Sequence, residues 1–404
     1  MDEIARDYLL LGLSLGELGE GVVDAYYGPP ELRAQVRARK PTAPVLVEEA
    51  EELRARAAAQ VSDPQRHRWL DRQIIGLETI ARTFAGEELP YIEEVRREFD
   101  ATPTATSPET YARVKRQLDD LLPSGTGSLH ERLNERDTRL TIPNDRLAGI
   151  LDWLVSQIRA TSAEVYSAPD GESVTLTIVK NEPWSAYNWY EGGLHSLIEF
   201  NTDLPTRAPQ LVSTLAHETY PGHHLEHAWK EQKLVVDQGR AECSLQLINT
   251  PEAYISEGLA EIGWRLVISP ERWQELLVGT CDQAGISLTP ADARRQWEIS
   301  EALRGLRGAS GDAALMFHAE GRSVDDVRRF LVEDGLASPD RAEKNVRFIN
   351  HPLWRTYVFC YAGGERLLTD WCSAAGDADA QRARFFRLLT EQLTPSGIAA
   401  ELTA

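Results

Sequence analysis

Residues 217–227 read His-Glu-Thr-Tyr-Pro-Gly-His-His-Leu-Glu-His and hold four of the nine histidines in the chain. The stretch begins like the metal-binding motif H-E-x-x-H, in which two histidines one helical turn apart reach the same ion. Proline stands here at the position of the second histidine. Its ring clashes with the carbonyl group of His217 and removes a helical N–H, and Gly222 weakens the helix further. The sequence therefore predicts that the helix breaks between Tyr220 and Gly222.

The residues before this stretch predict the helix that carries its first two members. Thr206 and Pro209 are typical of a helix start. The apolar residues that would form the buried face of this helix are Leu211, Val212, Leu215 and Ala216. At the end of such a helix His217 can face a metal, whereas Glu218 points in another direction and can act on a water molecule.

Two neighbouring histidines are candidates for the second metal ligand. In an unbroken helix His223 would point about 240° round the axis from His217 and would miss the metal. With two residues looped out, His223 takes the angular position of the second ligand, and with three looped out His224 takes it. We prefer His223 as the ligand, and the other histidine would then contact a ligand or the substrate. His227, one turn further on, is expected to be peripheral.

A catalytic zinc usually keeps three protein ligands and one open position, so a third ligand is needed. Residues 254–263 read Tyr-Ile-Ser-Glu-Gly-Leu-Ala-Glu-Ile-Gly and predict a second helix, with Glu257 and Glu261 one turn apart on one face. One of these carboxylates can bind the metal while the other accepts a hydrogen bond from a ligand histidine and fixes its tautomer. The spacing leaves open which carboxylate takes which role; with Glu257 as the ligand, Glu261 is the one that orients the histidine.

The composition predicts a large globular body with an acidic surface. The chain of 404 residues has 43 lysines and arginines against 63 aspartates and glutamates, a formal net charge of −20. Nucleic acids and anionic membranes require a basic surface, so neither is an expected partner. No segment approaches the ~20 apolar residues of a membrane span. Asp2 and Glu3 stand where a signal peptide would be basic, and we therefore expect a cytoplasmic protein.

Helical patterns dominate the N-terminal part of the chain. Apolar residues recur at helical spacing over residues 64–84. Ser107 and Pro108 are typical of a helix cap and a first-turn proline, so they predict another helix. We expect residues 1–166 to form a helical region and residues 167–404 to form the metal-binding region, both within one compact unit.

The hydrophobic period changes after residue 166. Residues 173–179 alternate β-branched and polar side chains and predict a strand, and residues 196–201 predict another. Residues 184–193 between them contain aromatics and glycines and predict a turn. Helices are expected from residue 209 to the end. The predicted fold class is mainly α (α+β): a large helical body with a small antiparallel sheet next to a broken metal-binding helix.

The run His-Glu-Thr-Tyr-Pro-Gly-His-His at residues 217–224 resembles the H-E-x-x-P-G-H-H signature of the bacterial "domain of unknown function 885" family, which is grouped with the gluzincin metallopeptidases. The chain departs from the family pattern at two positions. Leu259 replaces a usual tryptophan, and Ala314 stands where an aspartate is usual, with Asp312 nearby. The weaker matches cover most of the chain and are residues 23–30 (Val-Asp-Ala-Tyr-Tyr-Gly-Pro-Pro), Ser256-Glu-Gly-Leu-Ala260, Arg307 with His318-Ala-Glu-Gly321, and Tyr361-Ala-Gly-Gly364.

The resemblance implies a metallopeptidase-like fold and a zinc-dependent peptidase. Carried over to this sequence, His217 and Glu257 would hold zinc together with one of His223 and His224. Glu218 would then act as the general base. A zinc hydrolase of a small non-peptide amide and a zinc-binding protein without turnover are the alternatives.

Hydrolysis of an amide also needs a hydrogen-bond donor for the oxyanion that develops. The candidates are Tyr361, Tyr357, His318 and whichever of His223 and His224 does not bind the metal. A tyrosine or histidine on a packed helix is also a common core residue. We expect short peptides as substrates, in a cleft walled by the N-terminal helices, and the strand at residues 196–201 could pair with an extended peptide. The sequence leaves the oligomeric state open.

Overall fold

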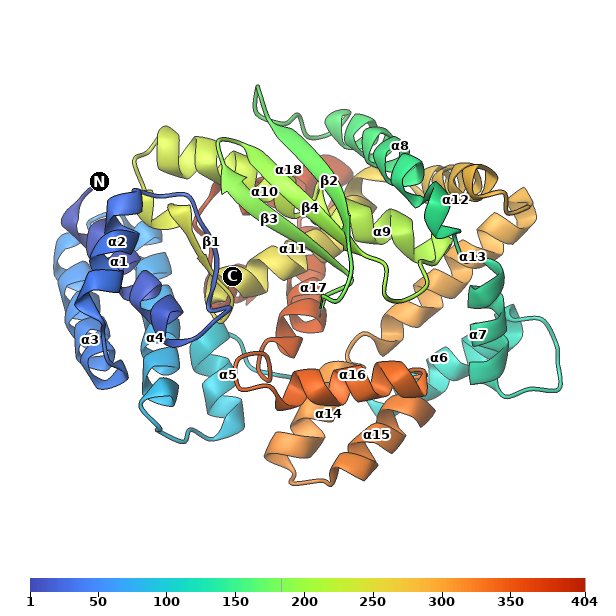
Figure 1. Ribbon diagram of the computed structural model, residues 1–404, viewed down its shortest axis with the longest axis horizontal. Helices are drawn as coiled ribbons and strands as arrows, with labels where there is room; N and C mark the ends of the chain where they lie inside the picture. Colours follow the sequence, from blue (N-terminus) through green and yellow to red (C-terminus); the bar gives the residue numbers. More distant parts are fainter. Residues whose placement is uncertain (183, 404) are drawn as a thin grey trace.

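Helices form where the capping residues and apolar faces predict them. The computed structural model describes residues 1–182 and 184–403. Ser107 caps α6 (Pro108–Leu121), because its side chain accepts a hydrogen bond from the backbone N–H of Thr110. Such a cap typically stabilises a helix by about 1 kcal/mol. The predicted fold class, mainly α with a small sheet, is confirmed (Figure 1).

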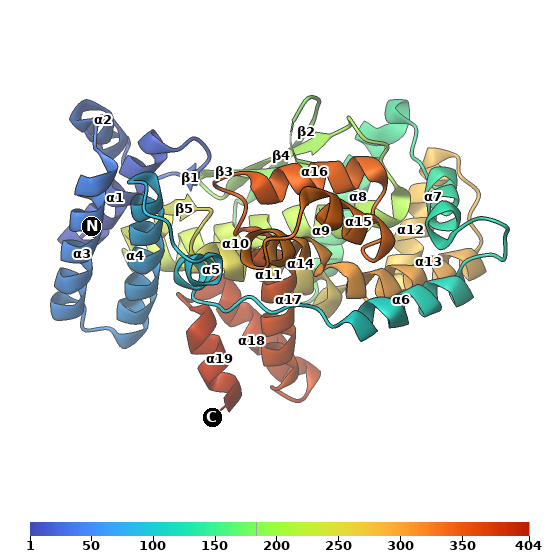
Figure 2. The same ribbon diagram turned by 90° about the horizontal axis from the view of Figure 1, so that it is seen from below.

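The N-terminal helices α1 to α4 stand side by side at one end of the molecule, and α6 and α7 lie toward the other end (Figures 1 and 2). The helices at the first end are α1 (Glu3–Leu18), α2 (Pro30–Arg39), α3 (Ala43–Gln60) and α4 (Pro64–Phe84). The helices that follow them before the main sheet are α5 (Tyr91–Phe99), α6, α7 (Leu129–Arg139) and α8 (Asn144–Ala163).

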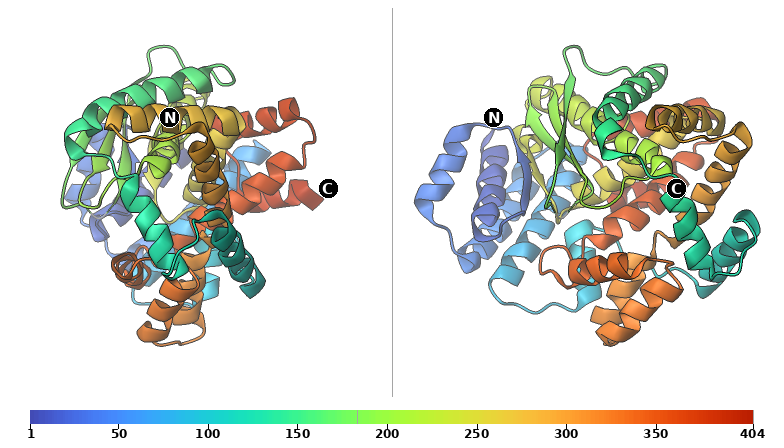
Figure 3. Two further views of the ribbon diagram at one scale, coloured as in Figure 1. Left: turned by 90° about the vertical axis from the view of Figure 1, so that its right-hand side faces the viewer. Right: turned by 45° about the vertical axis from the view of Figure 1, so that its right-hand side comes forward.

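After the main sheet the chain is mostly helical to its end, as the sequence predicts. The last two helices, α18 and α19, lie on the side of the molecule away from the sheet (Figures 2 and 3). The α-helices of this part are α9 (Ala208–Glu218), α10 (His223–Lys230), α11 (Pro251–Val267), α12 (Pro270–Ala284), α13 (Pro290–Leu303), α14 (Ala309–Ala314), α15 (Val324–Glu333), α16 (Pro339–Asn350), α17 (Val358–Ser373), α18 (Ala378–Thr390) and α19 (Pro395–Thr403). The short 3-10 and π segments are η1 (Glu231–Val236), η2 (Ala241–Ser244), η3 (Arg304–Leu306) and η4 (Leu315–Ala319).

The main sheet has three strands in the order β2-β4-β3. β2 (Ser173–Val179) and β4 (His195–Asn201) occur where the sequence predicts strands, but they pair in parallel. β3 (Ala186–Gly192) pairs antiparallel with β4 and occupies most of the segment predicted as a turn. Aromatic residues are good strand formers, and Asn188 and Tyr190 are buried in the alternation typical of a strand. The turn prediction is therefore wrong. Because β3 lies between β2 and β4 in the sequence and runs in the opposite direction to β4, β2 and β4 run in the same direction.

The strand β4 lies in the middle of this sheet. Both of its edges are paired, one with β2 and the other with β3, so its backbone has no free edge for an extended peptide. The prediction that residues 196–201 bind a substrate by edge pairing is therefore wrong. Within the described part of the chain, β2 and β3 are the edge strands of the sheet.

A second sheet joins the N-terminal helices to the segment that follows the histidines. β1 (Val23–Tyr26) pairs antiparallel with β5 (Leu245–Leu247). The backbone N–H of Tyr27 continues this contact by donating to the carbonyl oxygen of Ser244 at 3.1 Å. Asp24, in the middle of β1, is thereby brought to the region of the histidine cluster.

Three hydrophobic cores hold the helices together. The first packs α1, α3 and α4 against Leu245, Leu247 and Leu353. The second surrounds α9 with side chains of α8, α11, α12, α17 and α18. The third lies between α5, α6 and the helices α14 to α17. Each core combines residues from both sides of the boundary predicted after residue 166, and the division into two regions stays a prediction.

Helices α11 and α17 cross at a pair of glycines. A Cβ atom on Gly258 would lie 2.5 Å from the backbone carbonyl carbon of Gly364, so the crossing has no room for a side chain there. Glu257 precedes Gly258 in α11, and Tyr361 lies almost one turn before Gly364 in α17. This close approach of the two backbones sets the carboxylates of α11 against the tyrosines of α17.

Candidate metal centre

The helix that carries the histidines is broken, as the sequence predicts. α9 ends at Glu218, and α10 begins at His223. The backbone N–H of Thr219 still bonds to the carbonyl oxygen of Leu215 at 2.9 Å, which completes the last turn of α9. The break therefore occupies residues 219–222, and it begins slightly earlier than the sequence analysis placed it.

Gly222 allows the chain to fold back against the end of α9. A Cβ atom at this position would lie 1.8 Å from the carbonyl oxygen of His217, far inside any van der Waals contact. The carbonyl oxygen of Gly222 accepts the backbone N–H of Glu226 at 3.0 Å and so begins α10. The glycine thus brings the start of α10 directly beside His217.

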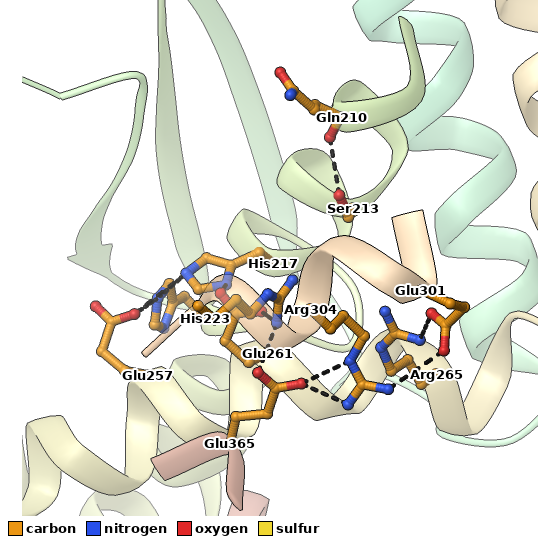
Figure 4. A network of polar contacts seen from close by, with 11 residues as sticks. Gln210, Ser213, His217, His223, Glu257, Glu261, Arg265, Glu301, Arg304 and Glu365 are labelled. Carbon is orange, nitrogen blue, oxygen red and sulfur yellow. Dashed lines mark hydrogen bonds and ion pairs between the residues drawn. The ribbon is translucent and has the colours of Figure 1, made fainter. Parts of the chain in front are cut away.

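Three of the predicted ligands converge on one point (Figure 4). The distance from Nε2 of His217 to Nε2 of His223 is 3.1 Å. The distances from Oε2 of Glu257 to these two nitrogens are 3.4 Å and 4.0 Å, respectively. Ligand atoms that lie ~2.1 Å from a tetrahedral zinc are separated from one another by about 3.4 Å. Two of the three distances lie within 0.3 Å of this value and the third is longer, so the three atoms are close enough together to share one ion.

The remaining ring nitrogens of the two histidines have other partners. Nδ1 of His217 lies 3.7 Å from Oε1 of Glu261, the carboxylate expected to orient it. Nδ1 of His223 lies 3.1 Å from Oγ of Ser256. When both Nδ1 atoms carry the proton, the two Nε2 atoms present lone pairs to each other and to Glu257, as metal-binding imidazoles do.

Glu257 provides a test of whether a cation fits. Its Oε1 accepts a hydrogen bond from the Tyr357 hydroxyl at 2.6 Å. Its Oε2 is buried and has no hydrogen-bond partner among the described residues. Leaving a buried charged oxygen without a partner costs more than the roughly 1–3 kcal/mol of a neutral group. A cation between this oxygen and the two histidines would satisfy it, so the residues present fit a metal.

The charges around the histidines also favour a bound cation. Burial alone would lower the pKa of His223, but the carboxylates of Glu226, Glu257 and Glu218 raise it to about 9. Burial would also lower the pKa of His217, and the carboxylate of Glu257, 3.4 Å from its Nε2, raises it instead. The centre therefore attracts positive charge, which a divalent ion supplies in place of protons. Two imidazoles and one carboxylate form a ligand set suited to zinc.

The predicted base, Glu218, is buried beside this centre. Burial raises the pKa of its carboxyl group, His217 and His223 lower it, and the negative charge of Glu257 raises it again. Its backbone carbonyl oxygen accepts a hydrogen bond from Nδ2 of Asn188 at 2.7 Å. This bond fixes β3 against the end of α9, so the edge of the sheet lies next to the base.

His224 is held away from the metal centre by two hydrogen bonds. Its Nδ1 lies 2.8 Å from Oγ of Ser196 in β4, and its Nε2 lies 2.7 Å from Oε2 of Glu172. Tyr220 donates to the same carboxylate at 2.6 Å, and Arg159 pairs with its other oxygen. Both ring nitrogens are thus already used, and burial lowers the pKa of His224. Its place in the fold is to attach α10 to the main sheet.

The Ser196–His224–Glu172 arrangement has the connectivity of a serine-hydrolase triad. A nucleophilic serine must reach the substrate, however, and both Ser196 and His224 are 0% exposed. No substrate carbonyl can approach that hydroxyl in this fold. We therefore assign the cluster to structural support.

Two tyrosines face the centre: Tyr357, which directly precedes α17, and Tyr361 in the first turn of that helix. Tyr357 is committed to Glu257 by the hydrogen bond described above, and its ring lies 5.7 Å from that of Tyr361. Burial and the charge of Glu257 raise the pKa of Tyr361 well above its ordinary value. Its hydroxyl group therefore keeps its proton, and of the two tyrosines Tyr361 stays the candidate donor.

His318 occupies a different part of the molecule. Its Nε2 bonds to the carbonyl oxygen of Ile349 in α16 at 2.7 Å, and its ring stacks on Tyr91 of α5 at 4.6 Å. Burial lowers the pKa of the ring. These contacts place His318 in the packing between α5 and α16, as expected for a histidine with a structural role.

Behind His217 lies a network of charges that the sequence analysis only partly anticipated (Figure 4). Glu261 is paired with Arg307. The same arginine donates to Oε2 of Glu365 at 2.9 Å, and Arg304 donates to Oε1 of Glu365 at 2.6 Å. Glu261 therefore links the ring of His217 to the arginines behind it.

Two neighbours of the centre were missed or misplaced by the sequence analysis. Asp24 accepts a hydrogen bond from Tyr187, and burial raises its pKa to about 6 against the opposing effect of His223. The only sequence signal for it was its place in the weak match at residues 23–30. His227, expected to be peripheral, is buried, and its Nδ1 lies 2.7 Å from Nε2 of Gln246.

A second group of possible ligands shares one residue with the first. His223, Glu226 and His227 also bring their ligand atoms within 4.8 Å of one another. Glu226, however, is already paired with the buried ammonium of Lys230 at 2.7 Å. A metal there would have to displace or repel this cation, so the group of His217, His223 and Glu257 is the better site.

Comparisons with known proteins address the fold and not the chemistry. No family model matches the chain, and no curated protein matches it. One solved structure with a similar fold is described as a "putative lipoprotein" from Colwellia psychrerythraea, with 14% identity, a TM-score of 0.55 and 89% of this chain covered. The chain spans 66% of the length of that protein.

A second similar structure is a "putative lipoprotein of unknown function" from Shewanella oneidensis. Its identity is 11% and its TM-score 0.50, with 96% of this chain and 81% of that chain covered. Identities this low show a shared fold alone. Among the described residues, no helix is both long and apolar enough to cross a bilayer. The cytoplasmic location stays a prediction.

Proposed function

We propose that this chain is a zinc-dependent hydrolase that cleaves peptide bonds in short peptides. The observation that carries the proposal is the convergence of His217, His223 and Glu257 around a buried carboxylate oxygen that has no other partner. The resemblance of residues 217–224 to the H-E-x-x-P-G-H-H signature supports a relation to the gluzincin metallopeptidases, which is part of the proposal.

Each residue of the centre has a separate task in this scheme. Bound zinc would polarise the substrate carbonyl group and lower the pKa of water to about 7. Glu218 would accept the proton of the attacking water and pass it to the leaving amine. Tyr361 would donate a hydrogen bond to the developing oxyanion, which its raised pKa allows because the hydroxyl group stays protonated.

Glu261 would hold the ring of His217 in place through Nδ1. The carboxylate lies 3.7 Å from that nitrogen and is paired with Arg307 on its far side. Partners of this kind fix both the tautomer and the orientation of a ligand histidine. This role is the one expected for Glu261 from its spacing to Glu257.

The sheet offers a place for the substrate main chain. β4 cannot pair with a substrate because it lies in the middle of the sheet. β3, in contrast, is an edge strand, and its Asn188 donates a hydrogen bond to the backbone carbonyl group of Glu218. An extended peptide could add to such an edge beside the base. A hydrolase of a small non-peptide amide, which would need no such edge, is the second candidate.

The proposal is tested by metal analysis and digestion in parallel. The wild-type chain is expected to hold about one zinc and to cleave members of a short-peptide library while leaving a folded protein intact. Glu218→Gln is the matched control, since it keeps the shape of the side chain and all three ligands. Zinc in both proteins with cleavage by the wild type alone would support the assignment. Zinc without peptide cleavage but with hydrolysis of a small amide would favour the second candidate.

A further inference from the structure

A line of buried polar contacts leads from the N-terminal helix α4 to His223. Nε1 of Trp69 donates to Oε2 of Glu252 at 2.7 Å. Lys230 pairs with the other oxygen of Glu252 and donates to Oε1 of Glu226 at 2.7 Å. Oγ of Ser256 donates to Oε2 of Glu226 at 2.6 Å. The line then reaches Nδ1 of His223, 3.1 Å from the same hydroxyl oxygen.

The direction of each hydrogen bond in this line is fixed by chemistry. An ammonium group and an indole N–H can only donate, and an ionised carboxylate can only accept. The single hydroxyl proton of Ser256 is used by Glu226, so Ser256 can only accept from His223. Nδ1 of His223 must therefore carry a proton, which leaves Nε2 as the nitrogen that can present a lone pair to a metal.

Burial makes this line rigid. The side chain of Glu226 is 0% exposed and that of Lys230 7% exposed. Water cannot readily replace a broken contact there, and breaking a buried charged pair is costly. Trp69 is 2% exposed, so its N–H has no alternative partner in solvent. The line consequently has one arrangement that satisfies the indole N–H, the Ser256 hydroxyl group and all four oxygens of the two carboxylates.

We infer that Ser256 and Glu226 are positioning residues that lock His223 in the Nδ1–H tautomer, and that Lys230 and Glu252 connect this lock to Trp69 in α4. The inference rests on the proposed zinc function and extends it. The metal centre is then supported from the N-terminal helices as well as from the helices that carry its ligands.

Ser256→Ala breaks the line at the step next to His223 without leaving a buried charge unpaired. Zinc affinity, measured by competition with a chelator, is expected to fall about 10–100-fold, the usual effect of losing a partner of a ligand histidine. Ser256→Thr, which restores the hydroxyl group, is expected to recover most of the affinity. The melting temperature of the metal-free protein is expected to stay near that of the wild type.

Ser213→Ala is the matched control. This serine lies in α9 with His217, and its hydroxyl group donates to the carbonyl oxygen of Gln210 at 3.0 Å (Figure 4). The variant removes the same atoms from the helix of a ligand without touching the line. Its zinc affinity is expected to equal that of the wild type. An equal loss in Ser213→Ala and Ser256→Ala would overturn the inference.

Trp69→Phe tests the distant end of the line. It keeps an aromatic ring in the core and removes the N–H donor, so a loss of zinc affinity of about 2–5-fold is expected, as for one remote hydrogen bond. An unchanged affinity would remove α4 from the support of His223.

Magnetic resonance of isotope-labelled histidine gives a readout that stability does not affect. In the zinc-loaded wild type, the Nδ1–H proton of His223 is expected to exchange slowly with water, and Ser256→Ala should accelerate the exchange. If the wild type binds zinc and Ser256→Ala binds it equally tightly, the tautomer lock is wrong and the proposed function stands. If the wild type binds no zinc, the proposed function fails and the inference fails with it.

Discussion

His223 and His224 are neighbours in the chain but belong to two different polar clusters. His224 lies with Ser196 and Glu172, and both of its ring nitrogens have a hydrogen-bond partner. His223 faces His217 and Glu257 with its Nε2, and Oε2 of Glu257, 4.0 Å from that nitrogen, has no hydrogen-bond partner among the described residues. In the first cluster both nitrogens of the histidine are already paired, whereas in the second cluster a buried carboxylate oxygen is not.

This difference separates structural support from a binding site. Two Nε2 atoms 3.1 Å apart cannot both be acceptors without a cation between them. A cluster whose donors and acceptors already match gains nothing from a ligand, whereas one with converging lone pairs does. The residue types alone would not have separated the two clusters, since both combine histidine with a glutamate.

The largest expected effect is on zinc binding by the neighbouring histidines. His223→Ala removes a ligand, so metal analysis after dialysis is expected to find almost no zinc. His224→Ala removes a buried anchor of α10 and leaves Glu172 without one partner, so it is expected to keep about one zinc and to lose stability. Full zinc retention by His223→Ala, with loss in His224→Ala, would reverse the roles of the two clusters.

The next effect concerns turnover. Glu218→Gln keeps the shape of the side chain and removes its ability to accept a proton. Hydrolysis of a peptide substrate is expected to slow by about 10²–10⁴-fold, the range for losing a general base, with zinc content unchanged. Initial rates together with metal analysis on the same preparation provide the measurement. Near-normal rates would remove Glu218 from the mechanism.

A smaller effect is expected from the glycine between the two clusters. Gly222→Ala places a methyl group against the carbonyl oxygen of His217, so the start of α10 must move. We expect weaker zinc binding and a loss of roughly 1–3 kcal/mol in the free energy of unfolding, as for overpacking.

Gly149→Ala is the control for this substitution. A Cβ atom at Gly149 in α8 would meet nothing within 4 Å. Alanine is the better helix former by about 0.5–1 kcal/mol, so denaturant unfolding should show a slight gain in stability. Equal behaviour of the Gly222→Ala and Gly149→Ala variants would show that the close approach at Gly222 does not matter.

An effect that depends on pH is expected from the cluster of Ser196, His224 and Glu172. Burial would raise the pKa of Glu172, but the hydrogen bonds from His224 and Tyr220 and the charge of Arg159 lower it to about 2. The folded-state pKa is thus below the unfolded value of about 4.3. Ionised Glu172 therefore stabilises the fold above pH ~4.3, and this contribution is lost as the pH falls toward 2.

Thermal unfolding of the metal-free protein between pH 7 and pH 3 measures this contribution. Glu172→Gln is expected to be less stable than the wild type at pH 7 by on the order of 2 kcal/mol. The difference between the two proteins should shrink as the pH approaches 3. A difference that stays constant over this range would mean that the charge of Glu172 contributes nothing.

The sequence predicted those features that depend on local chemistry. The broken helix follows from Pro221 and Gly222, and the spacing of His217 and His223 follows from the break. The pair Glu257 and Glu261 follows from helical periodicity. Such features need only the geometry of one helix and the residues within it.

The rest depends on contacts between distant segments. The partners of His224 come from Glu172 and from β4, about 50 and 30 positions earlier. The sequence of β3 predicts a turn because aromatic residues and glycines are compatible with a turn as well as with a strand. His318 had no local feature to show that it packs on Tyr91 of α5. Asp24 reaches the centre only because β1 pairs with β5.

The most direct test of the account is a crystal of the zinc-soaked protein measured at the zinc absorption edge. We expect one anomalous peak about 2.0–2.2 Å from Nε2 of His217, Nε2 of His223 and an oxygen of Glu257. His224 should keep its hydrogen bonds with Ser196 and Glu172. A peak bound by His224, or no peak at the convergence of the other three residues, would contradict the account.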